Sequence, residues 1–184
     1  MAMQRAPLWI VRHARPLIAD GVCYGASDVP AEPQSTRQCA QSLAVVLPEG
    51  TRVLSSPRRR CTALADALVQ ERPDLSWRAD DRLAEMDFGC WEGRPWSDIP
   101  KAAIDQWTAQ FGHWKFGGRE SVDDLMARVG AAWRQTVGSG APTLWISHAG
   151  VARAASLHAG GAASVRFATD WPVEGLGFGA WVRF

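Results

Sequence analysis

The sequence predicts an α/β fold, a three-layer α/β/α sandwich with a mostly parallel central sheet and an irregular cap inserted into it. Three short apolar runs carry this prediction, at residues 8–11, 52–54 and 143–146. They are continuous rather than alternating, which is typical of strands buried on both faces of a parallel sheet. Helical patterns follow or separate the runs, and such alternation indicates a layered domain. We expect residues 1–184 to form one domain.

Four stripes of apolar residues have helical spacing. The first two lie at residues 39–47 and 61–68, and the fourth at 151–158. The third runs from Val122 to Trp133 and is preceded by Ser121, with Asp124 three residues further on. That spacing is typical of a capping box, in which the two side chains close the start of a helix.

Two further segments complete the predicted fold. Residues 80–120 are irregular and rich in tryptophan, glycine and charge, so we expect a cap with one helix near residues 97–107. Its tryptophans could cover a site, although packing explains most of them equally well. Residues 176–184 carry an apolar residue at every second position, beginning with Leu176. This alternation predicts a half-buried strand at a sheet edge.

Composition restricts the class of protein. A chain of 184 residues can bury its own core, and a formal net charge of +1 with 21% charged residues favours neither nucleic acid nor an anionic membrane as a partner. The apolar run before Arg12 is too short for a signal peptide or a membrane span, so we expect a cytoplasmic protein. The cysteines form no Cys-x-x-Cys pair, which predicts free thiols and no structural metal; they are Cys23, Cys39, Cys61 and Cys90.

Polar clusters follow each of the three apolar runs. The first run ends at Arg12-His13, the second at Ser-Ser-Pro-Arg-Arg-Arg over residues 55–60, and the third at Ser-His-Ala-Gly over residues 147–150. Ligands of open α/β sheets bind beyond the carboxyl ends of the strands, so these clusters should converge. Arginines and helix N-termini both bind phosphate oxygens, and helix starts are expected at Ser56-Pro57 and Ala149-Gly150. The sequence therefore predicts a phosphate site.

The histidines divide into two pairs. A lone histidine is more often a buried, hydrogen-bonded core residue than a ligand, but His13 and His148 stand at matching strand ends beside arginines. His113 and His158 lack such neighbours, and we expect a loop residue and a filler of an apolar helix face. At least one arginine of residues 58–60 is expected to be a solvated helix residue.

These motifs resemble those of the histidine phosphatase (phosphoglycerate mutase-like) superfamily. Val-Arg-His-Ala at 11–14 resembles the family's Arg-His-Gly signature, Ser-Ser-Pro-x-x-Arg-Cys at 55–61 its second motif, and Ser-His-Ala-Gly at 147–150 its second histidine motif. Leu-x-Glu-Met-Asp-Phe-Gly-x-Trp-Glu-Gly at 83–93 resembles the segment that carries the acid. The four motifs stand in the family's order across nearly the whole chain.

The resemblance implies a phosphate-ester hydrolase that needs no metal or cofactor. His13 would be the nucleophile that is transiently phosphorylated, and Glu85 the proton donor. Phosphate would be held by the remaining matched positions, which are Arg12, Arg60, His148 and Ala149. Asp87 and Glu92 compete with Glu85, but we expect each to be a solvated loop acid.

Within the superfamily, the chain is most similar to the α-ribazole phosphatase branch, which is linked to cobalamin synthesis. The similarity lies in residues 21–25, 85–93 and 96–100, and in Glu120-Ser121 after two glycines. It implies a small-molecule phosphate such as α-ribazole 5'-phosphate, with a pocket rim that includes Cys23, Tyr24 and Trp91. The chain departs from the family where Ala14 and Ala149 replace glycines, where Arg119 interrupts Gly-Gly-Glu-Ser, and where an asparagine after the first motif is missing.

Three other interpretations stay open at this point. A phosphoglycerate mutase would pass the phosphoryl group to a hydroxyl instead of water. A non-catalytic module would bind a phospholigand without turnover. A metal site could use His13, His148 and a cysteine, and would be inhibited by chelators. An exposed edge strand or tryptophan patch would also permit a homodimer.

Overall fold

The central feature of the fold is a five-stranded sheet with strand order β3-β2-β4-β1-β5. The computed structural model describes residues 6–184. The strands are β1 (Leu8–Arg12), β2 (Arg52–Ser55), β3 (Trp77–Ala79), β4 (Thr143–Ser147) and β5 (Trp181–Arg183). The first four strands run parallel to one another, whereas β5 runs antiparallel to β1. The predicted mostly parallel sheet is confirmed.

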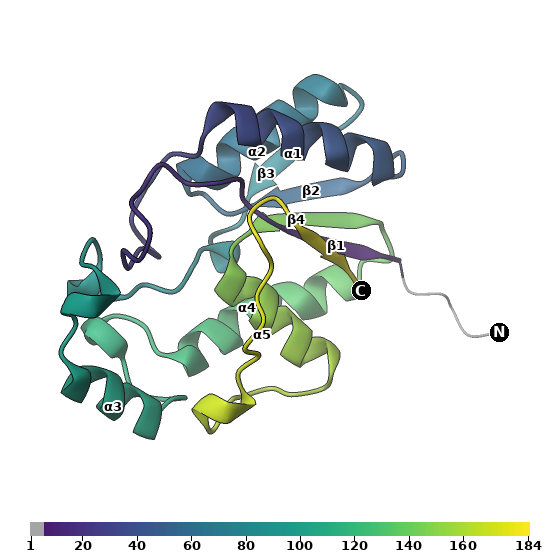
Figure 1. Cartoon of the computed structure of the whole chain (residues 1–184). Helices are drawn as coiled ribbons and strands as arrows, with labels where there is room; N and C mark the ends of the chain where they lie inside the picture. Colours follow the sequence, from purple (N-terminus) through teal and green to yellow (C-terminus); the bar gives the residue numbers. More distant parts are fainter. Residues whose placement is uncertain (1–5) are drawn as a thin grey trace.

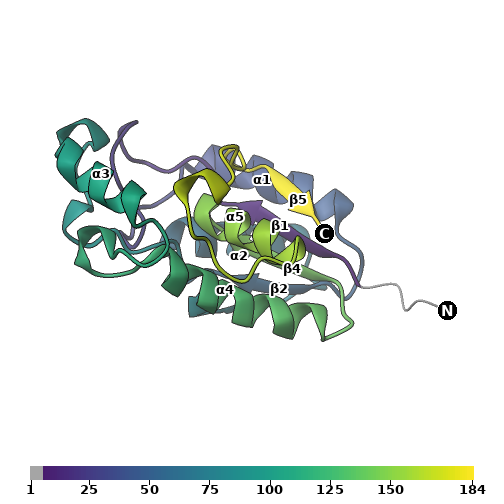
Figure 2. The same cartoon turned by 90° about the horizontal axis from the view of Figure 1, so that it is seen from below.

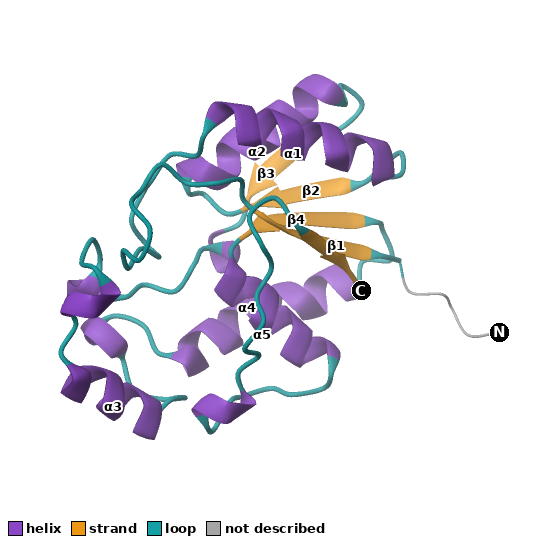
Figure 3. Cartoon of the chain, viewed as in Figure 1, coloured by secondary structure: helices purple, strands orange, loops and turns teal. Residues whose placement is uncertain are grey.

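Helices cover both faces of this sheet (Figures 1 and 3). Helices α1 (Pro33–Val46) and α2 (Arg59–Glu71) pack on one face, and α4 (Val122–Val137) and α5 (Ala149–Ala159) pack on the other. The predicted capping box starts α4, because the Ser121 hydroxyl accepts from the Asp124 amide at 3.1 Å and the Asp124 carboxylate accepts from the Ser121 amide at 3.1 Å. The three-layer α/β/α prediction is confirmed.

The predicted start of α2 at Ser56-Pro57 was wrong. The helix begins at Arg59, with Arg58 as the N-cap residue. Ser56 directly follows the last residue of β2, and its amide still donates to the Ile146 carbonyl at 2.9 Å across the sheet. Three residues, 56–58, therefore separate the end of β2 from the start of α2, while α5 does begin at Ala149 as expected.

The cap lies beyond the carboxyl ends of the parallel strands (Figures 1 and 2). Its only α-helix within the described residues is α3 (Lys101–Ala109), which starts after Pro100 and thus four residues later than predicted. Most cap tryptophans pack inside the cap, as the ring of Phe116 stacks on Trp107 at 4.4 Å and lies 5.8 Å from Trp91. The cap has its own small apolar core.

The C-terminal strand is much shorter than the alternation at residues 176–184 predicts. Only β5 pairs with β1, because Gly179 adopts a positive φ of 73° that turns the backbone out of the extended conformation. The amide of Gly179 contacts the carbonyls of Arg12 and His13, each at 3.1 Å. Residues 176–179 therefore form a loop across the end of β1.

Two further observations concern the whole described chain. Within residues 6–184, no helix is both long and apolar enough to span a membrane. All four cysteines are free thiols, as predicted, and Cys90 is exposed whereas the other three are buried.

Candidate active site

The three predicted polar clusters meet at one cavity at the carboxyl edge of the sheet. The cavity has a volume of about 250 Å³. We call it the central cavity, and it is lined by Arg12, His13, Val22, Tyr24, Arg60, Glu85, Trp96, His148 and Arg153. All five residues that the sequence assigned to catalysis lie on this wall. The strand order explains why, because β1, β4 and β2 are neighbours and end at the same edge.

His13 presents one ring nitrogen to the central cavity in the state that a nucleophile needs. Its side chain is buried, with 2% exposed, and Nδ1 lies 2.7 Å from the Ala14 carbonyl. Because a carbonyl can only accept, Nδ1 carries the proton and Nε2 keeps its lone pair. Burial first and the nearby Arg60 charge second lower the pKa of His13 from 6.5 to about 3. The imidazole is therefore neutral at physiological pH.

This lowered pKa predicts a specific loss of stability in acid. The unfolded chain takes up a proton on His13 below about pH 6.5 while the folded chain does not, so the free energy of unfolding falls as pH falls toward about 3, by up to about 1.4 kcal/mol per pH unit. We expect urea unfolding to show this loss. Between about pH 7 and about pH 5, the free energy of unfolding of the wild type should fall by about 2 kcal/mol more than that of His13→Gln. His113→Gln, at an exposed position, should lose as much as the wild type; equal losses in all three proteins would contradict the buried neutral ring.

Arg60 is the most deeply buried cation of the site. None of its surface is exposed, and its two terminal nitrogens donate to the carbonyls of Gly25 and Ser27 at 2.7 and 2.6 Å. Its Nε is buried and finds no hydrogen-bond partner in the described part of the chain. By contrast, Arg59 is exposed, which confirms that one arginine of this run is a solvated helix residue.

Arg12 brings a second guanidinium to the central cavity. It donates to the Leu176 carbonyl at 2.8 Å, and its guanidinium carbon lies 3.8 Å from the centre of the Phe178 ring. Both partners belong to the loop of residues 176–179. Because that segment is predicted as a strand from sequence, neither contact follows from the sequence pattern.

His148 lies beside His13, with the two ring centres 5.1 Å apart. Its Nε2 is 2.8 Å from the Ser56 hydroxyl and 3.5 Å from the Cys61 sulfur. Burial and the neighbouring Arg60 charge hold the pKa of His148 well below 6.5. Its Nδ1 is buried and has no protein partner among residues 6–184, so that nitrogen is available to a ligand.

Glu85 is fixed against the start of α5. Its Oε2 accepts from the Gly150 amide at 3.0 Å, and its Oε1 accepts from the Met86 amide at 3.1 Å. A Cβ at position 150 would overlap the carboxylate, so glycine is what permits this close approach. A carboxylate on a helix N-terminus receives a free amide and a partial positive charge.

The competing acids occupy other places. Asp87 accepts from the Gly89 amide at 2.8 Å and does not line the central cavity. Glu92 is not a solvated loop acid as predicted, because its carboxylate accepts from the amides of Gly25, Ala26 and Phe88 at 3.0, 2.9 and 3.0 Å. Burial acts to raise the pKa of Glu92, but the hydrogen bonds from Ser27 and these amides hold it below its ordinary value.

The predicted pocket rim needs correction at two of its three positions. Tyr24 lines the central cavity, whereas Cys23 is fully buried against Ile99 and Phe116, and Trp91 packs on Phe116. Ala149 is the first residue of α5 and is not part of the cavity wall. Trp96, one of the cap tryptophans expected to cover a site, does line the cavity, whereas sequence reasoning missed two other wall residues, Val22 and Arg153. Arg153 could have been found, since it lies one helical turn after Gly150 in the predicted helix.

The structure also places the other residues on which the sequence makes a prediction. His158 is half-buried, with Nε2 2.9 Å from the Met126 carbonyl, and His113 is exposed. Arg119 is exposed, and its Nε lies 3.7 Å from the Asp87 carboxylate.

Among the described residues, no group of three or more His, Cys, Asp or Glu is placed to hold a metal ion. Burial raises the pKa of the Cys61 thiol to about 12.

The fold and site together define an α/β protein with two neutral buried histidines among arginines at the edge of its sheet. Residues 8–174 match the histidine phosphatase superfamily (branch 1). The chain belongs to this superfamily.

Several solved structures are similar over almost the whole chain. A mycobacterial glucosyl-3-phosphoglycerate phosphatase in complex with inorganic phosphate is 25% identical, with a TM-score of 0.78 over 98% of this chain and 89% of that one. A protein from Thermus thermophilus is 27% identical, with a TM-score of 0.68 over 96% and 92%. A proposed α-ribazole-5'-P phosphatase from Escherichia coli is 23% identical, with a TM-score of 0.79 over 98% and 90%, which shows the fold alone. Among curated protein sequences, none matches significantly.

Proposed function

We propose that this protein is a phosphomonoester hydrolase that works through a phosphohistidine on His13. The observation that carries the proposal is the state of that ring, since Nε2 is unprotonated and the wall of the central cavity also carries three arginines, namely Arg12, Arg60 and Arg153. Membership of the histidine phosphatase superfamily supports phosphatase activity in general. The residue roles and the substrate given below are part of the proposal.

In the first half-reaction, Nε2 of His13 forms a bond to phosphorus as the bond to the leaving oxygen breaks. Glu85, in its protonated form, donates its proton to that oxygen. Arg12, Arg60 and Nδ1 of His148 stabilise the phosphoryl oxygens, where charge is spread in a loose transition state.

In the second half-reaction, water replaces the product alcohol. Glu85, now a carboxylate, accepts a proton from the water as its oxygen attacks phosphorus. The bond between phosphorus and His13 breaks, which releases inorganic phosphate and restores the neutral ring. The same carboxyl group therefore serves as acid and then as base.

The position of Glu85 indicates where the leaving group binds. In-line attack places the leaving oxygen opposite His13 and beside the proton donor. Glu85, Trp96 and Arg153 line both the central cavity and a second cavity of about 210 Å³. The rest of that second wall is almost entirely apolar and largely aromatic, namely Met86, Phe88, Trp107, Phe111, Val122, Leu125, Gly150 and Trp171.

A larger groove of about 680 Å³ shares Arg12 and Tyr24 with the wall of the central cavity. It is lined by Arg12, Tyr24, Phe178 and residues 15–21, and Glu85 does not contribute to it. A leaving group seated there would lie away from the proton donor. We therefore propose that the aromatic cavity binds the leaving group and that the natural substrate carries a flat apolar group, as α-ribazole 5'-phosphate does.

One observation favours a second candidate, phosphoglycerate mutase-type transfer. Arg153 places a third guanidinium on the wall of the central cavity, and its Nε is buried without a partner in the described residues. A guanidinium at this place could bind the carboxylate of a phosphoglycerate. The two candidates differ in whether water or a sugar-acid hydroxyl accepts the phosphoryl group.

A metal-free substrate screen tests the proposal. Chelator-treated protein should hydrolyse α-ribazole 5'-phosphate with a higher kcat/KM than 3-phosphoglycerate or a phosphohistidine protein, and added chelator should leave the rate unchanged. Labelled substrate should leave an acid-labile phosphate on His13. Interconversion of phosphoglycerates would instead support the mutase, loss of activity with chelator would support a metal enzyme, and tight phosphate binding without turnover would support a non-catalytic module.

A further inference from the structure

The segment that carries Glu85 has little regular structure of its own. It lies between two single-turn helices, Asp81–Leu83 and Gly89–Trp91. A loop of this kind is held by side chains from elsewhere rather than by a ladder of backbone hydrogen bonds. The position of the carboxyl group of Glu85 therefore depends on what holds residues 82–87.

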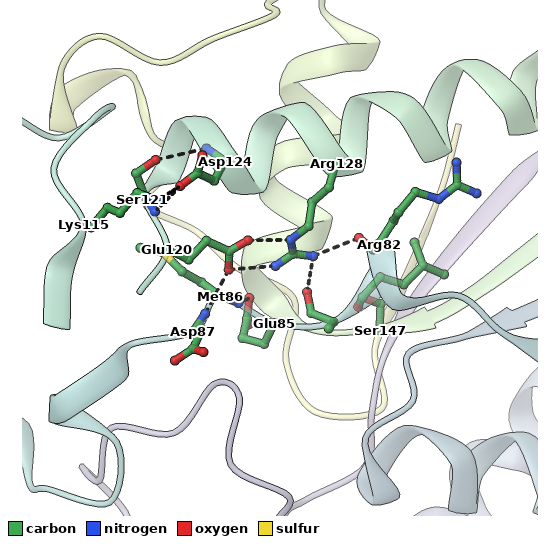
Figure 4. Close-up of polar contacts among 12 residues, drawn as sticks. Arg82, Glu85, Met86, Asp87, Lys115, Glu120, Ser121, Asp124, Arg128 and Ser147 are labelled. Carbon is green, nitrogen blue, oxygen red and sulfur yellow. Dashed lines mark hydrogen bonds and ion pairs between the residues drawn. The ribbon is translucent and has the colours of Figure 1, made fainter. Parts of the chain in front are cut away.

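One ion pair from outside the segment holds it on both sides of Glu85 (Figure 4). Nη1 of Arg128 donates to the carbonyls of Arg82 and Ala84 at 2.9 and 2.6 Å. Nε and Nη2 of Arg128 donate to the two carboxylate oxygens of Glu120 at 2.6 and 3.1 Å. Oε2 of Glu120 in turn accepts from the Asp87 amide at 2.9 Å. The pair thus fixes backbone groups one and three residues before Glu85 and two residues after it.

The pair also links Glu85 to a rigid element. Arg128 lies on α4, whose first turn is fixed by the capping box of Ser121 and Asp124, and Glu120 immediately precedes that box. The Ser147 hydroxyl adds a contact to the Leu83 carbonyl at 2.7 Å and stands next to His148. Through these contacts, the Glu85 backbone is tied to α4 and to the end of β4 together.

The two side chains are buried enough for the pair to hold its geometry. Their exposed fractions are 21% for Arg128 and 16% for Glu120. A freely exposed pair contributes little, but this guanidinium satisfies two backbone carbonyls as well as a bidentate carboxylate. These four hydrogen bonds need the planar guanidinium group of arginine, because the single ammonium group of lysine cannot make them all.

We propose that Arg128 and Glu120 are positioning residues that place the carboxyl group of Glu85 against the leaving oxygen. The inference rests on the proposed function, in which Glu85 is the proton donor. Neither residue lines the central cavity, so each acts through Glu85 and not on the substrate. Their loss should therefore affect proton donation more than binding of the phosphoryl group.

The test compares two substrates that differ in their need for a proton donor. Arg128→Met should slow an alkyl phosphate such as ribose 5-phosphate by about tenfold to a hundredfold, the cost of a misplaced catalytic group. Turnover of p-nitrophenyl phosphate, whose leaving group needs little protonation, should change far less. KM and inhibition by inorganic phosphate should stay within about twofold, because no phosphate ligand is removed. Arg128→Lys should restore only part of the alkyl phosphate rate.

The chain offers a matched control for lost stability. Arg72 also donates to two backbone carbonyls, those of Ala44 and Leu47, and to both oxygens of a carboxylate, Asp74. That set lies where α1 and α2 end, and Arg72→Met should leave the ratio of the two substrate rates unchanged. A double variant provides a further check, because Arg128→Met should add almost nothing to Glu85→Gln if both act through one carboxyl group.

The outcomes separate this inference from the proposed function. If wild type forms the phosphohistidine but Arg128→Met slows both substrates equally, as does Arg72→Met, the pair is only structural and the inference fails. Full additivity of Arg128→Met and Glu85→Gln would also overturn it. If Arg128→Met does not fold, Glu120→Gln, which keeps the shape of the side chain, must show the same substrate selectivity. Absence of any phosphatase activity in the wild type would instead contradict the proposed function.

Discussion

Replacing His13 with alanine should abolish turnover of every phosphomonoester. The variant loses the only atom that can form the covalent intermediate, and loss of a nucleophile costs on the order of 10⁵- to 10⁶-fold in kcat. Rapid-quench experiments with labelled substrate should show an acid-labile phosphate on the wild type and none on the variant. Phosphate binding should survive in part, because the guanidinium groups of Arg12 and Arg60 stay in the cavity wall.

The exposed His113 supplies the matched control for this prediction. It lies in the cap, outside the central cavity, so His113→Ala should keep full activity and the full yield of phosphoenzyme. Labelled phosphate recovered on His13→Ala, or turnover within about tenfold of the wild type, would mean that another group is the nucleophile.

Replacing Glu85 with glutamine should produce the second largest effect, and one that depends on the leaving group. The amide cannot donate an acidic proton, and general acid catalysis contributes about 10²- to 10⁴-fold, so hydrolysis of an alkyl phosphate should fall by that amount. Hydrolysis of p-nitrophenyl phosphate should fall much less. The comparison is made as kcat for both substrates with the same protein sample.

Asp87→Asn is the control for this second prediction, because Asp87 lies two residues away and off the cavity wall. It should leave the ratio of the two rates close to that of the wild type. Equal slowing of both substrates by Glu85→Gln would remove Glu85 from the donor role and would direct attention to the remaining acids of the cap.

The parts of the fold that sequence predicts well are those with a strong local pattern. Strands β1, β2 and β4 are continuous apolar runs, and each ends in residues that line the site or contact its wall. Strand β3 is not predicted, because it has only three residues and two of them, Arg78 and Ala79, are exposed. The loop at 176–179 is mistaken for a strand, because alternation alone does not reveal the positive φ of Gly179.

The residues of the site also differ in whether a local sequence pattern reveals them. His13, Arg60 and His148 can be found because each stands at the end of a recognisable strand or start of a helix. Glu92 and Arg128 act on the backbone of segments far away in sequence, such as Gly25 for Glu92 and Ala84 for Arg128. A side chain that hydrogen-bonds to backbone groups far away in sequence produces no pattern of residue spacing. Only the folded structure therefore reveals its role.

The loop of residues 25–27 is held on both sides, and this limits how its length can change. Its amides point to the Glu92 carboxylate while two of its carbonyls point to Arg60. A single inserted or deleted residue would shift the alternation of amides and carbonyls, so that neither charged group could keep its partners. The backbone of Met86 leaves no room for a Cβ at Gly25 either. Laboratory evolution of new substrate preferences should therefore reject insertions and deletions in this loop.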